Sequence, residues 1–86
     1  MKRKVLRVAD DAAIMDSLSE VLTDEGFEVL EAVNGREAIE RLRSEAAPPH
    51  LILLDLMMPE MDGRAFRHAQ QSEPTWSRIP TLVMTA

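Results

Sequence analysis

The sequence predicts a single α/β domain in which helices flank a parallel β-sheet. Two observations lead to this prediction. The chain has 86 residues, which is enough for one small domain, and its short apolar runs alternate with segments of helical periodicity. Strands that alternate with helices form parallel sheets joined by right-handed crossovers. The expected order of elements is therefore β-α-β-α-β-α-β.

The four expected strands are short apolar runs bounded by polar or turn-forming residues. Continuous runs of this kind are typical of strands that are buried on both faces of a parallel sheet. The four runs are Val5–Ala9, Phe27–Val33, Leu51–Leu54 and Thr81–Thr85. Arg7 interrupts the first run, and we expect its side chain to point into a packed face.

Three helices are expected between these strands. The first helix carries an apolar stripe that we expect to lie in the core, and Gly26 is its expected stop signal. The members of the stripe are Ile14, Leu18, Val21 and Leu22. The second helix follows the turn at Asn34-Gly35. The third spans Arg64–Gln71, and a connection that Trp76 is expected to anchor leads from it to the last strand.

The composition excludes several classes of protein. Fifteen acidic and ten basic residues give a net charge of -5, which provides no general attraction to nucleic acid or to an anionic membrane surface. The absence of cysteine excludes disulfide frameworks, thiol catalysis and cysteine-ligated zinc. His50 and His68 share no metal-ligand spacing. Because no apolar run approaches a membrane span and no signal peptide is present, we expect a cytoplasmic protein.

Side chains that could bind a ligand or take part in a reaction lie at the ends of three expected strands. Asp10-Asp11 follow the first strand, Asp55 follows the third, and Thr85 ends the fourth. The carboxyl ends of parallel strands meet at one edge of the sheet, where ligands bind. Carboxylates held close together repel one another and favour a bound cation, and oxygen ligands suit Mg²⁺. The residues alone leave open that Asp10 or Asp11 is only the N-cap of the following helix.

Three segments of the chain match a known pattern. They are Asp10-Asp11, the segment 53–63 with the sequence LLDLMMPEMDG, and Ile79-Pro80 with the MTA that ends the sequence. Asp55 lies 44 residues after Asp11 and 30 residues before Thr85. With these spacings the chain resembles, over essentially its whole length, the receiver domain of bacterial response regulators in two-component systems. The resemblance implies a flavodoxin-like, doubly wound parallel sheet with strand order 2-1-3-4-5.

The resemblance also implies a function, which is that of a phosphoacceptor and not of an enzyme. Asp55 would receive a phosphoryl group from a phosphohistidine on a sensor histidine kinase or phosphotransfer protein. Asp10, Asp11 and Asp55 would hold Mg²⁺ together with the backbone carbonyl of Met57. Thr85 would contact a phosphoryl oxygen and act as a switch.

The chain departs from the family pattern after Thr85. We expect residues 1–86 to form a receiver domain that is truncated after the fourth strand and lacks the last helix-strand-helix portion. The lysine that ends the fifth strand in the family is absent with it. The fourth strand then has an exposed edge, and we expect the protein to self-associate through that edge.

Two other functions are alternatives to that of a phosphoacceptor. A degenerate receiver would act only in protein–protein interaction or dimerisation, without phosphorylation. A metal-dependent phosphatase with an aspartyl nucleophile is disfavoured, because that class needs a second acid where this chain has Met57. We expect no nucleic-acid or membrane partner for this segment.

Overall fold

The computed structural model describes residues 3–10, 13–55 and 63–84. Within these ranges strands and helices alternate, as the sequence predicts. The elements are β1 (Lys4–Val8), α1 (Ala13–Asp24), β2 (Glu28–Ala32), α2 (Gly35–Ser44), β3 (Leu51–Asp55), α3 (Gly63–Ser72), α4 (Pro74–Ser77) and β4 (Thr81–Met84). The short helix α4 lies where the sequence predicts only a connection, so that part of the prediction is wrong.

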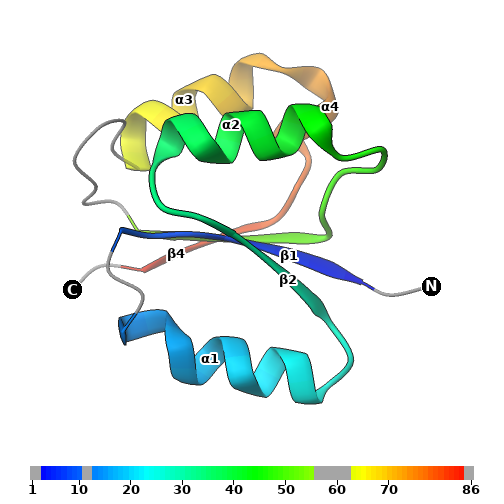
Figure 1. Cartoon of the computed structure of the whole chain (residues 1–86). Coiled ribbons are helices and arrows are strands. Elements are labelled where there is room, and N and C mark those ends of the chain that lie inside the picture. Colours follow the sequence, from blue (N-terminus) through cyan, green and yellow to red (C-terminus); the bar gives the residue numbers. More distant parts are fainter. Residues whose placement is uncertain (1–2, 11–12, 56–62, 85–86) are drawn as a thin grey trace.

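The four strands form one parallel sheet in the order β2-β1-β3-β4. Helix α1 covers one face of this sheet, and α2 and α3 cover the other (Figure 1). Helices on both faces of a parallel sheet bury both faces of its central strands, which explains why β1 and β3 are apolar runs. The predicted α/β, doubly wound fold is confirmed.

The core consists of two clusters of buried side chains, one on each face of the sheet. Successive residues of a strand point to opposite faces, so β1 and β3 contribute to both clusters. The cluster on the side of α2 and α3 comprises Leu6, Val8, Ala32, Ala38, Ile39, Leu42, Ile52, Leu54, Phe66 and Ile79. The smaller cluster on the side of α1 comprises Val5, Ala9, Met15 and Leu53, with Leu18, Leu22, Phe27 and Leu51 partly buried against it.

Helix α1 buries part of the predicted stripe and one residue outside it. Met15 is 1% exposed and Leu18 and Leu22 are partly buried, whereas Val21 is 56% exposed. A residue advances by about 100° around a helix, so Val21 lies about 120° from Met15 and faces away from the sheet. The prediction that Val21 belongs to the core is wrong, and the side chain of Ile14 lies outside the described residues.

Local signals fix where the helices begin and end. Gly26 has φ +95°, and the N–H groups of Gly26 and Phe27 donate to the carbonyls of Thr23 and Leu22, both at 3.0 Å. This pair of hydrogen bonds closes the carboxyl end of α1 and confirms the predicted stop. At the start of α2, Asn34 Oδ1 accepts a hydrogen bond from the Glu37 N–H at 2.8 Å.

The connection from α3 to β4 is anchored as predicted, because Trp76 in α4 packs against the larger cluster. None of the helices in the described ranges is long and apolar enough to cross a membrane.

Candidate functional site

Two of the predicted site residues lie at one edge of the sheet. Asp55 is the last residue of β3 and is partly buried, while Asp10 is exposed just beyond the end of β1. Because β1 and β3 are parallel neighbours, their carboxyl ends place both acids at the same edge. Asp11, Met57 and Thr85, which were also predicted here, lie outside the described residues.

The register of β1 and β3 indicates which residue of the first strand follows alongside Asp55, whose printed partner on the other side is Met84 of β4. The last paired residues are Val8 and Leu54, so the next positions along the two strands are Ala9 and Asp55. The Ala9 N–H donates to the Ala32 carbonyl at 3.0 Å, which continues the hydrogen bonding of β1 to β2 by one residue. The β1 residue beside Asp55 is therefore an alanine, which reasoning from the sequence missed.

The donors at this edge are suited to a hard cation in kind but are few in number. Carboxylate oxygens with open positions for water are the ligands that Mg²⁺ takes in proteins. Asp10 and Asp55 supply such oxygens, but no group of three or more His, Cys, Asp or Glu side chains is close enough to hold a metal within the described ranges. The chemistry of these two donors fits Mg²⁺, and the other predicted ligands, Asp11 and Met57, lie outside the described residues.

A buried arginine, whose partners the sequence does not reveal, joins the strand that precedes Asp10 to the helix that follows it. Arg7 Nη1 lies 3.1 Å from Asp16 Oδ1 and 2.8 Å from Ser19 Oγ, both in α1. Its Nη2 lies 3.1 Å from Glu31 Oε1 in β2. The Arg7 side chain is only 7% exposed. These contacts hold α1 against β1 and β2.

A second polar network fixes the entry into β4. Gln70 in α3 is fully buried, and its Nε2 donates to the carbonyls of Trp76 at 2.9 Å and Ile79 at 3.2 Å. Its Oε1 accepts hydrogen bonds from Arg67 at 2.8 Å and from the Thr81 hydroxyl at 3.3 Å. Because β4 begins at Thr81, this network positions the strand that leads to Thr85.

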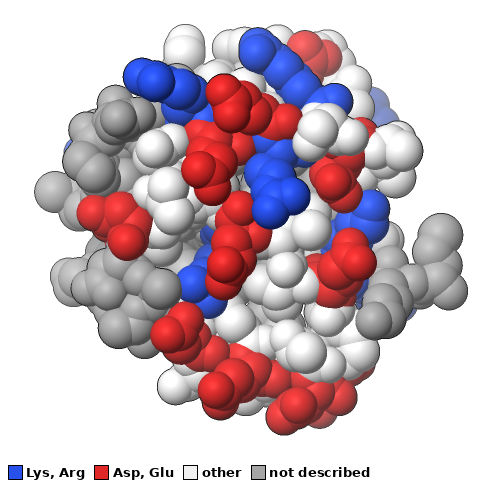
Figure 2. Space-filling view, in the orientation of Figure 1, with Lys and Arg blue, Asp and Glu red and all other residues white. Residues whose placement is uncertain are grey.

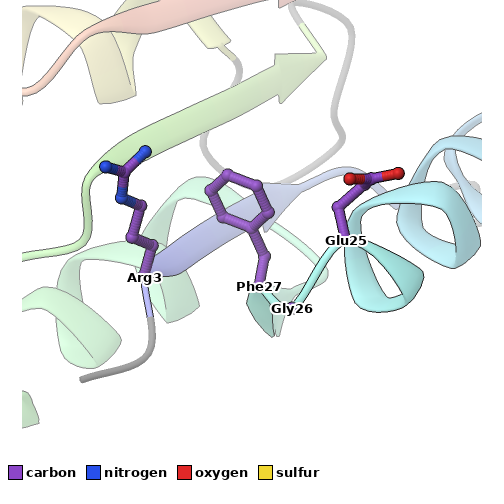
Figure 3. Close-up of a pocket in the computed structure, with 4 residues that line it drawn as sticks. All are labelled: Arg3, Glu25, Gly26 and Phe27. Atoms are coloured by element: carbon purple, nitrogen blue, oxygen red, sulfur yellow. The ribbon is translucent and has the colours of Figure 1, made fainter.

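Asp55 is not among the residues that line either of two pockets found in the described part of the chain. One, of about 270 Å³, is lined by Arg3, Glu25, Gly26 and Phe27, and in Figure 3 the Phe27 ring lies between the side chains of Arg3 and Glu25. These residues lie near the amino ends of β1 and β2, which is the opposite edge of the sheet from Asp55.

The other pocket, of about 340 Å³, lies between α1 and β2, where acidic side chains surround Arg7. Acidic side chains also line the lower edge of the molecule in Figure 2, where α1 lies in Figure 1. Of the acids that line this pocket, Asp16 and Glu31 pair with Arg7, and Asp55 is not among the lining residues.

Comparison with known proteins assigns the family. Residues 5–86 match the model of the response regulator receiver domain. The chain is 40% identical over 85 residues to the probable transcriptional regulator ycf27 of Porphyra purpurea, and 37% identical over 86 residues to the response regulator MprA of Mycolicibacterium vanbaalenii. These matches cover 99% and 100% of the chain but 33% and 36% of the two relatives, so the chain spans about a third of their length.

Solved structures agree with the sequence comparison. The phosphorylated cyanobacterial phytochrome response regulator RcpA superposes with a TM-score of 0.88 at 36% identity, covering 99% of this chain and 66% of that one. The chemotaxis response regulator CheY4 of Vibrio cholerae gives a TM-score of 0.85 at 32% identity, covering 96% and 68%. The fold, the acidic edge and these relatives agree: the chain belongs to the family of response regulator receiver domains, which are signalling modules of two-component systems.

Proposed function

We propose that the chain is a phosphoacceptor and that Asp55 is the residue that accepts the phosphoryl group. The position of Asp55 carries this proposal: it ends the central strand β3, is partly buried, and shares its edge of the sheet with Asp10. A carboxylate oxygen of Asp55 would attack the phosphorus of a phosphohistidine on a sensor histidine kinase. The P–N bond would break, and the released imidazole nitrogen would take up a proton. The product is an aspartyl phosphate and a free histidine.

The acidic edge is also the proposed site of Mg²⁺. Asp10, Asp11, Asp55 and the backbone carbonyl of Met57 would hold the ion, and Mg²⁺ bound there would offset the charge that the phosphoryl oxygens bring to the site. Asp55 pairs with Met84 of β4, and Thr85 follows Met84 in the sequence. The Thr85 hydroxyl is therefore proposed to contact a phosphoryl oxygen.

The test is a measurement of intact mass. The chain is incubated with Mg²⁺ and a small acyl-phosphate donor, and we expect a gain of one phosphoryl group. Asp55→Asn removes the acceptor and should abolish the gain, whereas the matched variant Asp16→Asn changes an exposed acid of α1 and should keep it. An unchanged mass in folded wild-type protein, or an equal gain in Asp55→Asn, contradicts the proposal.

A second candidate function is an interaction module that is not phosphorylated. The observation in its favour is the outer strand β4, where Leu82 is 53% and Val83 44% exposed. Within the described sheet, β4 pairs with β3 alone, so one edge of β4 is open to another strand. Self-association without a phosphoryl gain would favour this function over the first.

A further inference from the structure

A small pocket at the amino edge of the sheet carries two opposite charges. Its volume is about 270 Å³, and its lining residues are Arg3, Glu25, Gly26 and Phe27. Ligand pockets commonly measure about 300 to 1,000 Å³, so this pocket suits a small molecule. We propose that it binds a zwitterion whose ammonium and carboxylate groups are separated by an apolar chain, as in an ω-amino acid. The site lies at the opposite edge of the sheet from Asp55, and the inference does not depend on the proposed phosphoacceptor role.

The backbone places the Phe27 ring between the two charges. Lys4 of β1 pairs with Glu28 of β2, so Arg3 and Phe27 are the residues that precede this pair on the two chain segments. Glu25 lies two residues before Phe27, directly after the last residue of α1. Figure 3 shows the ring between the side chains of Arg3 and Glu25. None of the ion pairs in the described part of the chain includes either residue, so both charges are available to a ligand.

The carboxyl end of α1 favours a cationic group. A helix carries a partial negative charge at this end, which basic side chains in the last turn offset. Helix α1 has no basic residue in its last turn, and the exposed acids Asp24 and Glu25 add two carboxylates there. A ligand ammonium group beside Glu25 would offset this negative charge. On the other side of the ring, the Arg3 guanidinium suits a carboxylate, which it can bind through two parallel hydrogen bonds.

The Phe27 ring determines how far apart the two charges of the ligand must be. Phe27 is partly buried against the cluster on the side of α1, which holds the ring in place. Beside it, Gly26 has no side chain, and a Cβ there would meet no heavy atom within 4 Å, so the pocket stays open. A ligand with both charges on one carbon atom, such as an α-amino acid, reaches one side of the ring only. A chain of methylene groups can lie across the ring and place one charge on each side.

The experiment is a titration of the whole chain with ε-aminocaproate, followed by the amide signals of Gly26 and Phe27 in proton–nitrogen correlation NMR spectra. Contacts to exposed charges are weak, so we expect a Kd of about 1 to 10 mM. L-norleucine is the matched control ligand, because it is an isomer with both charges at one end. Its Kd should be higher by about fivefold or more. Equal Kd values for the two isomers, or no saturable shift with ε-aminocaproate up to about 50 mM, would overturn the inference.

Variants test the two charges separately. Arg3→Gln and Glu25→Gln each remove one charge from an exposed side chain, and each should raise the Kd for ε-aminocaproate by about threefold or more. Glu20→Gln is the matched control, because it removes an exposed acid of α1 that does not line this pocket, and its Kd should equal that of the wild type. The same spectra show that each variant is folded. An unchanged Kd in either Arg3→Gln or Glu25→Gln contradicts the proposed site.

The same ligand chemistry has two sources, and a third ligand distinguishes them. A peptide that ends in lysine also presents an ammonium and a carboxylate group separated by methylene groups. If acetyl-alanyl-lysine binds as tightly as ε-aminocaproate, the site accepts the end of a protein chain. If only ε-aminocaproate binds, the site is selective for the free ω-amino acid. Both results support a zwitterion site at this pocket.

Discussion

Arg7 places a charge inside a small core, and the exposure of its partners determines what that arrangement costs. The guanidinium is nearly buried, whereas the side chains of Asp16 and Glu31 are 61% and 63% exposed. Water can therefore hydrate the two acids fully when Arg7 is removed, whereas the nearly buried guanidinium is hydrated less completely when the acids are removed. Removing Arg7 and removing its acidic partners should therefore cost different amounts of stability.

The difference in burial between Arg7 and its partners predicts which of two variants loses more free energy of unfolding. The double variant Asp16→Ala/Glu31→Ala leaves the buried Arg7 guanidinium without its acidic partners. It should lower the free energy of unfolding by about 3 to 5 kcal/mol. Arg7→Met keeps the apolar volume and removes the charge, and should cost about 1 to 2 kcal/mol. Urea unfolding followed by circular dichroism measures both. A larger loss for Arg7→Met than for the double variant contradicts this account.

At the scale of single residues, the sequence predicts where side chains lie better than it predicts what they contact. Asp55 is predicted at the carboxyl end of a strand and lies there. Arg7 is predicted to point into a packed face and is buried. The position of Ala9 alongside Asp55 could not be predicted, because it depends on which residues of β1 and β3 pair. Register is fixed by packing over the whole sheet and not by the sequence of one strand.

At the scale of elements, local signals determine where these helices begin and end, whereas tertiary packing determines which face of a helix is buried. Gly26 and Asn34 act within their own segments, so the end of α1 and the start of α2 could be read from the sequence. The stripe that α1 buries depends on how the helix lies on the sheet. Met15 is therefore buried where the sequence favoured Val21, although both are apolar.

The end of α1 carries a prediction about backbone strain. Gly26 has φ +95°, a conformation that costs other residues about 1 to 2 kcal/mol. A Cβ at this position would meet no heavy atom within 4 Å, so backbone strain and not a clash sets the cost. Gly26→Ala should lower the free energy of unfolding by this amount, while Glu25→Ala, next to it, should have a much smaller effect. Chemical unfolding measures both, and equal losses would contradict the explanation by strain.

The link between β1 and α2 carries a prediction about pH. Lys4 Nζ lies 2.8 Å from Glu45 Oε1 at the end of α2, and this hydrogen bond raises the pKa of Lys4 above its usual 10.5. A raised pKa means that the pair stabilises the fold at pH values below 10.5 and that this contribution is lost as the pH rises through the folded value. Glu45→Gln should therefore lower the Tm at pH 7, and its difference from the wild type should shrink above pH 10.5. A difference independent of pH contradicts this assignment.

At the scale of the whole molecule, the two faces of the sheet are covered unequally. Among the described elements, α2 and α3 lie over one face, and α1 is the one helix over the other (Figure 1). Leu82 of β4 pairs with Leu53 and so faces the side of α1, yet it remains 53% exposed. The chain covers about two thirds of the solved receiver chains RcpA and CheY4. That residues 1–86 form a truncated receiver domain, and that it is cytoplasmic, both stay predictions.

The exposed strand predicts how the 86-residue chain behaves in solution. An open edge with apolar side chains favours pairing with a second copy, so the apparent mass should rise with protein concentration. Leu82→Lys places a charge on this strand and should shift the equilibrium towards monomer, whereas Val21→Lys, on the exposed side of α1, should not. Sedimentation equilibrium measures the masses. A wild type that stays monomeric at all concentrations contradicts the role of β4.

The most direct test of the central claim is to locate the phosphoryl group on the chain. After incubation with Mg²⁺ and a small acyl-phosphate donor, borohydride reduces an aspartyl phosphate to homoserine, which peptide mass spectrometry assigns to a position. We predict homoserine at position 55, and only when the donor is present. Homoserine at Asp10 or another acid, or at no position in protein shown to be folded, would contradict the assignment of Asp55 as the phosphoacceptor.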